Sequence, residues 1–90
     1  MILIRLPVNA ASATGGVQEL KLDAATVGSA LKQLFERFPD LRERFRAPTG
    51  ELRRTLLFHV NGEDIRFLEG EETALPPGAE LSITPMLAGG

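Results

Sequence analysis

The chain has 90 residues, which is enough for one domain with a single hydrophobic core and too few for a second domain. Its apolar fraction of 43% and charged fraction of 24% predict an ordinary folded domain rather than a disordered or membrane-embedded chain. The net charge of -2 argues against a nucleic-acid binder, and the absence of cysteine excludes disulfides and thiolate metal sites. We therefore expect a cytoplasmic protein that binds neither nucleic acid nor membrane.

The N-terminal third has the pattern of two strands. Residues 2–7 alternate with period two, so that Ile2, Ile4 and Leu6 share one face of a strand. A polar stretch over residues 9–16 ends in two glycines, and a strand resumes over residues 17–22. This pattern predicts an N-terminal hairpin.

A helix follows, for which Thr26 is a suitable N-cap and at which Pro39 forces an end. Asp40 is positioned to cap a further short turn in which Leu41 and Phe45 are neighbours, before a loop over residues 47–50. Apolar residues recur at the three- and four-residue spacing of one helical face at Val27, Ala30, Leu31, Leu34, Phe35 and Phe38.

The C-terminal half has the pattern of a second hairpin and a last strand. Residues 56–60 alternate, Asn61-Gly62 is a strong hairpin-turn signal, and residues 65–68 are expected to return as a strand. A turn over residues 76–78 precedes a final strand that ends at Pro85.

This order of elements predicts an α+β fold of the β-grasp (ubiquitin-like) type, with a mixed four- to five-stranded sheet packed on one main helix. We expect the domain to span residues 1–85. Residues 86–90 are expected to form a flexible tail that ends in Gly-Gly.

The tail, residues 87–90 (Leu-Ala-Gly-Gly), and residues 60–67 (Val-Asn-Gly-Glu-Asp-Ile-Arg-Phe) carry a resemblance to a known family. The chain resembles the bacterial sulfur carriers of the ubiquitin-like superfamily, which include MoaD, ThiS and CysO, and it looks closest to CysO or MoaD-like members. Two departures leave the sulfur acceptor open. Pro85-Met86 stands where molybdopterin synthase subunits usually have two prolines, and an insertion over residues 41–54 exceeds the length of a typical thiamine carrier.

The resemblance implies that Gly90 carries the sulfur, as an adenylate and then a thiocarboxylate, and that Gly89 is its required neighbour in the tail. The implied partners are an E1-like adenylating and sulfurtransferase enzyme of the MoeB/ThiF type and a sulfur-accepting synthase, either a cysteine synthase or the large subunit of molybdopterin synthase. The activating enzyme would consume ATP, and the carrier itself would bind no cofactor. Such a protein is a carried reagent, not an enzyme.

The remaining residues support two alternative functions and several surface roles. The alternatives are a protein modifier that forms isopeptide conjugates and an interaction domain with an inert tail. One histidine builds no catalytic or metal site, so we expect His59 to be structural or to dock a partner. A docking face is expected at Leu3, Leu57, His59, Met86 and Leu87, unless residues 41–54 cover it.

Charge is distributed unevenly along the chain, with five arginines between residues 42 and 54 and most acidic residues later. The simplest interpretation is solvated surface. Otherwise we expect the acidic half to lie nearer the tail and to steer docking onto basic partner surfaces.

Overall fold

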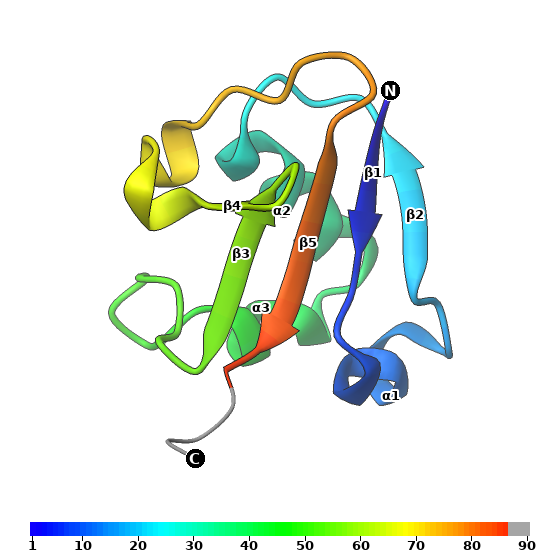
Figure 1. Cartoon of the computed structure of the whole chain (residues 1–90). Helices are drawn as coiled ribbons and strands as arrows, with labels where there is room; N and C mark the ends of the chain where they lie inside the picture. Colours follow the sequence, from blue (N-terminus) through cyan, green and yellow to red (C-terminus); the bar gives the residue numbers. More distant parts are fainter. Residues whose placement is uncertain (87–90) are drawn as a thin grey trace.

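The computed structural model of the protein describes residues 1–86 of the chain and contains a five-stranded sheet with helices on one of its faces (Figure 1). The strands are β1 (Ile2–Arg5), β2 (Glu19–Leu22), β3 (Leu56–Val60), β4 (Glu63–Asp64) and β5 (Glu80–Pro85). The α-helices are α1 (Ala11–Thr14), α2 (Val27–Arg37) and α3 (Asp40–Phe45), and the 3₁₀ helices are η1 (Val8–Ala10), η2 (Ile65–Phe67) and η3 (Gly70–Glu72).

The sheet has the strand order β2-β1-β5-β3-β4. The first and last strands, β1 and β5, pair in parallel at its centre, with Ile4 opposite Leu81, and every other pair is antiparallel. The mixed sheet with one main helix is the β-grasp fold that the order of elements predicted.

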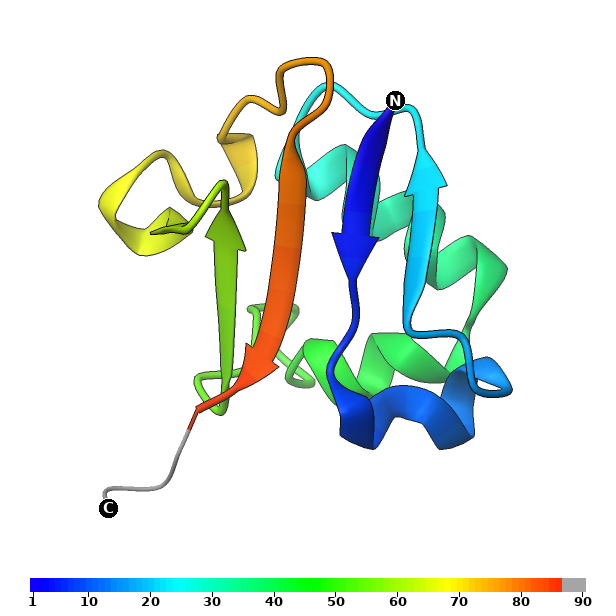
Figure 2. The same ribbon diagram turned by 45° about the vertical axis from the view of Figure 1, so that its right-hand side comes forward.

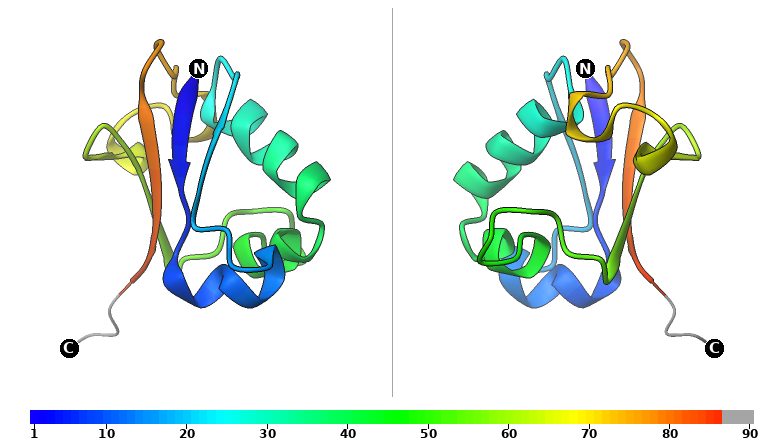
Figure 3. Two further views of the ribbon diagram at one scale, coloured as in Figure 1. Left: turned by 90° about the vertical axis from the view of Figure 1, so that its right-hand side faces the viewer. Right: turned by 90° about the vertical axis from the view of Figure 1, so that its left-hand side faces the viewer.

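Helix α2 covers one face of this sheet because its apolar residues lie on one side. Thr26 caps it as predicted, since the Thr26 side-chain oxygen accepts a hydrogen bond from the Ser29 backbone N–H at 3.2 Å. The helix ends at Arg37, before Pro39, and Leu31 and Leu34 are fully buried against the inward residues of the strands. Figure 3 shows that the helices lie on one side of the sheet and that its other face is open.

Helix α3 forms where a further short turn was expected, and it buries both Leu41 and Phe45. The capping residue is Pro39, however, and Asp40 is the first helical residue. A carboxylate at that position is favourable near the positive end of the helix dipole.

Two segments differ from the sequence predictions. Part of the polar stretch before β2 is helical, as η1 and α1, which are joined to α3 by hydrogen bonds from the Arg44 guanidinium to the Asn9 carbonyl and the Ser12 hydroxyl. The prediction of a return strand over residues 65–68 was wrong, because residues 65–67 form η2. The Asp64 carboxylate accepts a 2.8 Å hydrogen bond from the Arg66 backbone N–H, which caps a 3₁₀ turn and ends the pairing with β3.

The turn between β3 and β4 is the one that Asn61-Gly62 predicted. Asn61 has φ 50° and Gly62 has φ 89°, the left-handed conformations of a tight hairpin turn. The Asn61 side-chain oxygen also accepts a 2.9 Å hydrogen bond from the Glu80 backbone N–H, which ties this turn to the start of β5.

Residues 46–55 form a loop on the side of the sheet that carries the helices (Figure 2). Its ends are joined by hydrogen bonds, including that from the Arg53 backbone N–H to the Phe45 carbonyl at 2.8 Å. The loop therefore extends the layer of helices and leaves the outer face of the sheet uncovered.

Candidate functional site

The described chain leaves the folded body at the end of β5. The Met86 backbone N–H donates a 2.8 Å hydrogen bond to the Thr55 carbonyl, so Met86 is still attached to the loop before β3. Beside it lies a hollow of about 370 Å³, and a smaller one of about 130 Å³ shares Leu56 with it. The first hollow is lined by Asn9, Ala10, Arg44, Phe45, Thr55, Leu56, Pro85 and Met86.

The expected sulfur-bearing residue Gly90, its neighbour Gly89, and Leu87 of the expected docking face lie outside the described residues. Covalent geometry still limits where a terminal carboxylate on Gly90 can reach. Four residues span at most about 14 Å, because a fully extended chain advances about 3.5 Å per residue. The reactive group expected at Gly90 therefore stays within that distance of Met86.

The structure brings some of the expected docking residues together and separates one of them. Leu57 and His59 lie on the open face of the sheet, opposite Thr84 and Ser82 of β5. Thr84 is two residues before Met86, so Leu57 lies close to the exit of the tail. Leu3 shares this face but is opposite Glu80, at the far end of β5.

Arginines lie near the point where the chain leaves β5, whereas the sequence led us to expect acidic residues there. Arg44 lines the larger hollow, and Arg53 and Arg54 line the smaller one together with the ion pair of Asp64 and Arg66. Glu63 and Glu80 lie at the opposite end of the sheet, beside Val60 and the beginning of β5. The expectation that the acidic half lies nearer the tail was wrong for Glu63 and Glu80, because β5 runs away from both of them.

The sequence shows that these arginines are clustered, but charge along the chain does not show that they lie near the end of β5. The pairing of β3 with β5 contains the information that predicts their position. Leu56 pairs with Pro85 at the base of β3, so Thr55, which directly follows Arg53 and Arg54, lies beside Met86.

Several ionisable side chains among residues 1–86 form ion pairs. The Arg66 guanidinium donates to both carboxylate oxygens of Asp64, to Oδ2 at 2.7 Å and to Oδ1 at 3.1 Å, and holds the pKa of Asp64 below its usual range. Among residues 1–86 there is no group of three or more histidine or acidic side chains placed to hold a metal ion. No helix in this described part is long and apolar enough to cross a membrane.

Comparison with known proteins shows the family. The sequence model described as the ThiS family matches residues 4–90, which is almost the whole chain and includes the Gly-Gly ending. The chain belongs to the ThiS family. It is therefore a sulfur carrier protein, and ThiS-family carriers are carrier proteins without catalytic activity of their own.

Two curated relatives agree with the ThiS-family assignment. The sulfur carrier protein CysO of Mycobacterium tuberculosis is 31% identical over 91 residues, covering 99% of this chain and 98% of CysO. A putative sulfur carrier protein of Archaeoglobus fulgidus is 35% identical over 89 residues, with the same coverage of 99% and 98%.

Solved structures of similar proteins share the fold of this ThiS-family chain. A chain in the crystal structure of the Amycolatopsis orientalis BexX/CysO complex superposes with a TM-score of 0.88, at 29% identity and complete coverage of both chains. The small archaeal modifier protein 1 of Methanosarcina acetivorans superposes with a TM-score of 0.85, at 30% identity and coverage of 99% and 95%.

Proposed function

We propose that the carboxylate of Gly90 is the group that carries sulfur, and that the acceptor pathway is cysteine biosynthesis of the CysO type. The observation that carries the proposal is the match to the ThiS family through residue 90, together with the CysO relative at 31% identity over nearly its full length. The exposure of Met86, which directly follows β5, supports it, because an enzyme has access to the point where the described chain ends.

The chemistry requires a partner, because a carboxylate is a poor electrophile at neutral pH. A carboxylate oxygen of Gly90 attacks the α-phosphorus of ATP on an E1-like enzyme, and pyrophosphate leaves. Sulfide then attacks the carbonyl carbon of the acyl-adenylate, AMP leaves with its bonding electron pair, and a thiocarboxylate remains. Gly89 suits this reaction because a residue without a side chain passes through a narrow channel to the nucleotide.

Intact-mass measurement after incubation with an E1-like adenylating enzyme, ATP and sulfide tests the first part. We expect a mass increase equal to the replacement of one oxygen by one sulfur. Two controls keep the whole folded body, one a variant that lacks Gly90 and the other a variant with one alanine added after Gly90. A mass shift that persists in both variants, or is absent from the unaltered protein, would contradict the proposal.

The acceptor is tested separately with the isolated thiocarboxylate form. With an O-activated serine as second substrate, a pyridoxal-phosphate-dependent cysteine synthase should join the thiocarboxylate sulfur to the serine Cβ with loss of the activating group. An acyl shift from sulfur to the amine then leaves cysteine attached through the Gly90 carbonyl. The large subunit of molybdopterin synthase with its pterin precursor is the matched comparison. Sulfur transfer only in that second reaction would exclude the cysteine route while leaving the carrier function intact.

A second candidate function is protein modification, which the similarity to small archaeal modifier protein 1 favours. The same activated glycine would then react with a lysine amine and form an isopeptide bond, with release of the activating group. Epitope-tagged protein expressed in cells would give heavier conjugates on denaturing gels. Deletion of Gly90 should remove these conjugates if this function operates.

A further inference from the structure

Three arginines lie at the end of the sheet where the chain leaves β5, and the functions described above do not use them. We call Arg44, Arg53 and Arg54 the arginine collar. Arg44 lines the same hollow as Pro85 and Met86. Arg53 and Arg54 directly precede Thr55, whose carbonyl accepts the hydrogen bond from the Met86 N–H.

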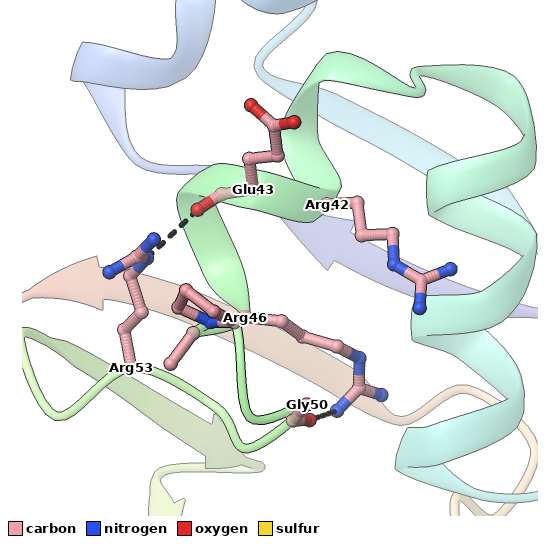
Figure 4. A pocket seen from close by; sticks show the side chains of 7 residues that line it. Arg42, Glu43, Arg46, Gly50 and Arg53 are labelled. Carbon is pink, nitrogen blue, oxygen red and sulfur yellow. Dashed lines mark hydrogen bonds between the residues drawn. The ribbon is translucent and has the colours of Figure 1, made fainter.

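Local hydrogen bonds hold two members of the arginine collar in place without neutralising them. The Arg53 side-chain Nε donates to the Glu43 backbone carbonyl at 2.8 Å. Figure 4 shows that the Glu43 carboxylate points away from the Arg53 guanidinium. The Arg44 guanidinium donates to the Asn9 carbonyl at 3.1 Å and to the Ser12 hydroxyl at 3.0 Å, and both acceptors are uncharged.

The positive charge of the collar is therefore exposed to a partner. The arginines that form ion pairs within residues 1–86 are Arg5, Arg46 and Arg66, none of which belongs to the collar. Arg44 and Arg54 are exposed, and Arg53 is half-buried. This local charge contrasts with the net charge of -2 of the whole chain.

The reach of the tail makes the collar part of any contact with an enzyme that works on Gly90. Four residues after Met86 extend at most about 14 Å, and an enzyme that surrounds the terminal carboxylate must enclose most of that length. Its entrance then faces the rim around Met86, where the collar lies. This step rests on the proposed function of Gly90.

We propose that the arginine collar docks onto an acidic rim around the channel of the adenylating enzyme that receives the tail. Carboxylates are the matching chemistry, since guanidinium groups form two-pronged bonds with them and opposite charges speed encounter between proteins. The outer face of the sheet contributes apolar contact at Leu57, and the collar orients the molecule with its tail toward the channel.

Carrier-dependent exchange of labelled pyrophosphate into ATP, catalysed by the E1-like adenylating enzyme of the same organism, tests the proposal. Arg54→Glu is the probe variant, because this exposed side chain makes no hydrogen bond in the described part of the chain. Arg37→Glu is the matched control, since Arg37 is also exposed but lies beside Leu22 of β2, at the other edge of the sheet. Circular dichroism checks that both variants fold.

We expect the carrier concentration that gives half-maximal exchange to rise about tenfold for Arg54→Glu and to stay unchanged for Arg37→Glu. The unaltered protein should also bind more weakly as salt increases, with a smaller salt dependence for Arg54→Glu. Equal half-maximal carrier concentrations for the two variants would overturn the docking role of the arginine collar while leaving the carrier function intact. No exchange with the unaltered protein would instead overturn the proposed function, and this inference with it.

Discussion

Arg46 and Glu71 form a two-pronged ion pair, with Nη2 to Oε1 at 2.6 Å and Nη1 to Oε2 at 3.0 Å. The pair joins the beginning of the 46–55 loop to η3, which are 25 residues apart in the chain. The same guanidinium lies 5.7 Å from the centre of the Phe35 ring and donates to the Gly50 carbonyl at 2.9 Å. Hydrogen bonding to Glu71 raises the pKa of Arg46, so the guanidinium stays charged.

Arg46→Ala should therefore lower the free energy of unfolding by about 1–2 kcal/mol, because it removes charge-assisted hydrogen bonds that are partly shielded from water. Arg54→Ala, which removes an exposed arginine, should change it by less than about 0.5 kcal/mol. Urea unfolding followed by circular dichroism measures both values. Equal effects would show that the ion pair contributes nothing beyond ordinary surface charge.

Phe45→Ala should cost about 3–5 kcal/mol, since Phe45 is only 1% exposed and packs edge-to-face against Phe35 and Phe58. Phe67→Ala is the control, because Phe67 is 84% exposed and its truncation leaves no cavity. We expect the control to shift the thermal midpoint by no more than a degree or two. A comparable loss in both variants would contradict the placement of Phe45 in the core.

Asn61→Ala should destabilise the protein by about 1–2 kcal/mol, because alanine disfavours a φ of 50° and removes the acceptor for the Glu80 N–H. Asn61→Asp keeps both the tolerance of that conformation and the acceptor oxygen, so it should lose much less. Chemical denaturation of the two variants makes the comparison. The prediction fails if aspartate is as harmful as alanine.

Stability should fall at low pH partly through Asp64. Its pKa is lower in the folded protein than in the unfolded chain, mainly through hydrogen bonding to Arg66, so the ionised pair stabilises the fold above a pH of about 4. That contribution is lost as the pH falls through the lowered pKa of the folded state. Asp64→Asn should therefore flatten the acid limb of a stability profile below about pH 4, and an unchanged limb would contradict it.

Leu57→Glu should weaken activation by the adenylating enzyme more than Leu3→Glu does. Both leucines lie on the open face of the sheet, but Leu57 pairs with Thr84 near the tail, and Leu3 pairs with Glu80 at the far end. The rate of pyrophosphate exchange at low carrier concentration compares them. If Leu3→Glu is the more harmful change, docking extends over the other end of the sheet.

The sequence predicts best where a local rule and the packing of the core agree. Thr26 and Pro39 bound α2 as expected, because a side-chain cap and a missing N–H act within one turn of the helix. The strand predicted at residues 65–68 failed because its apolar residues are compatible with either structure, and the local hydrogen bond from Arg66 to Asp64 determined the outcome.

The surroundings of the site depended on pairing between distant parts of the chain. Periodicity correctly placed Leu57 and His59 on the outer face. It gave no measure of the separation of Leu3 from them, which is set by the register of β1 and β3 on β5. The position of Thr55 beside Met86, with Arg53 and Arg54 directly before it in the chain, likewise follows from the pairing of Leu56 with Pro85. Charge counted along the sequence contains no such information.

The central position of β5 has a mechanical consequence. A partner that grips the tail and turns or withdraws it applies force along β5, which is hydrogen-bonded to β1 on one side and to β3 on the other. Both sets of bonds lie across that direction and are loaded in shear, so they must break together rather than one at a time. The fold therefore resists unfolding when a partner pulls on the C-terminal end of β5.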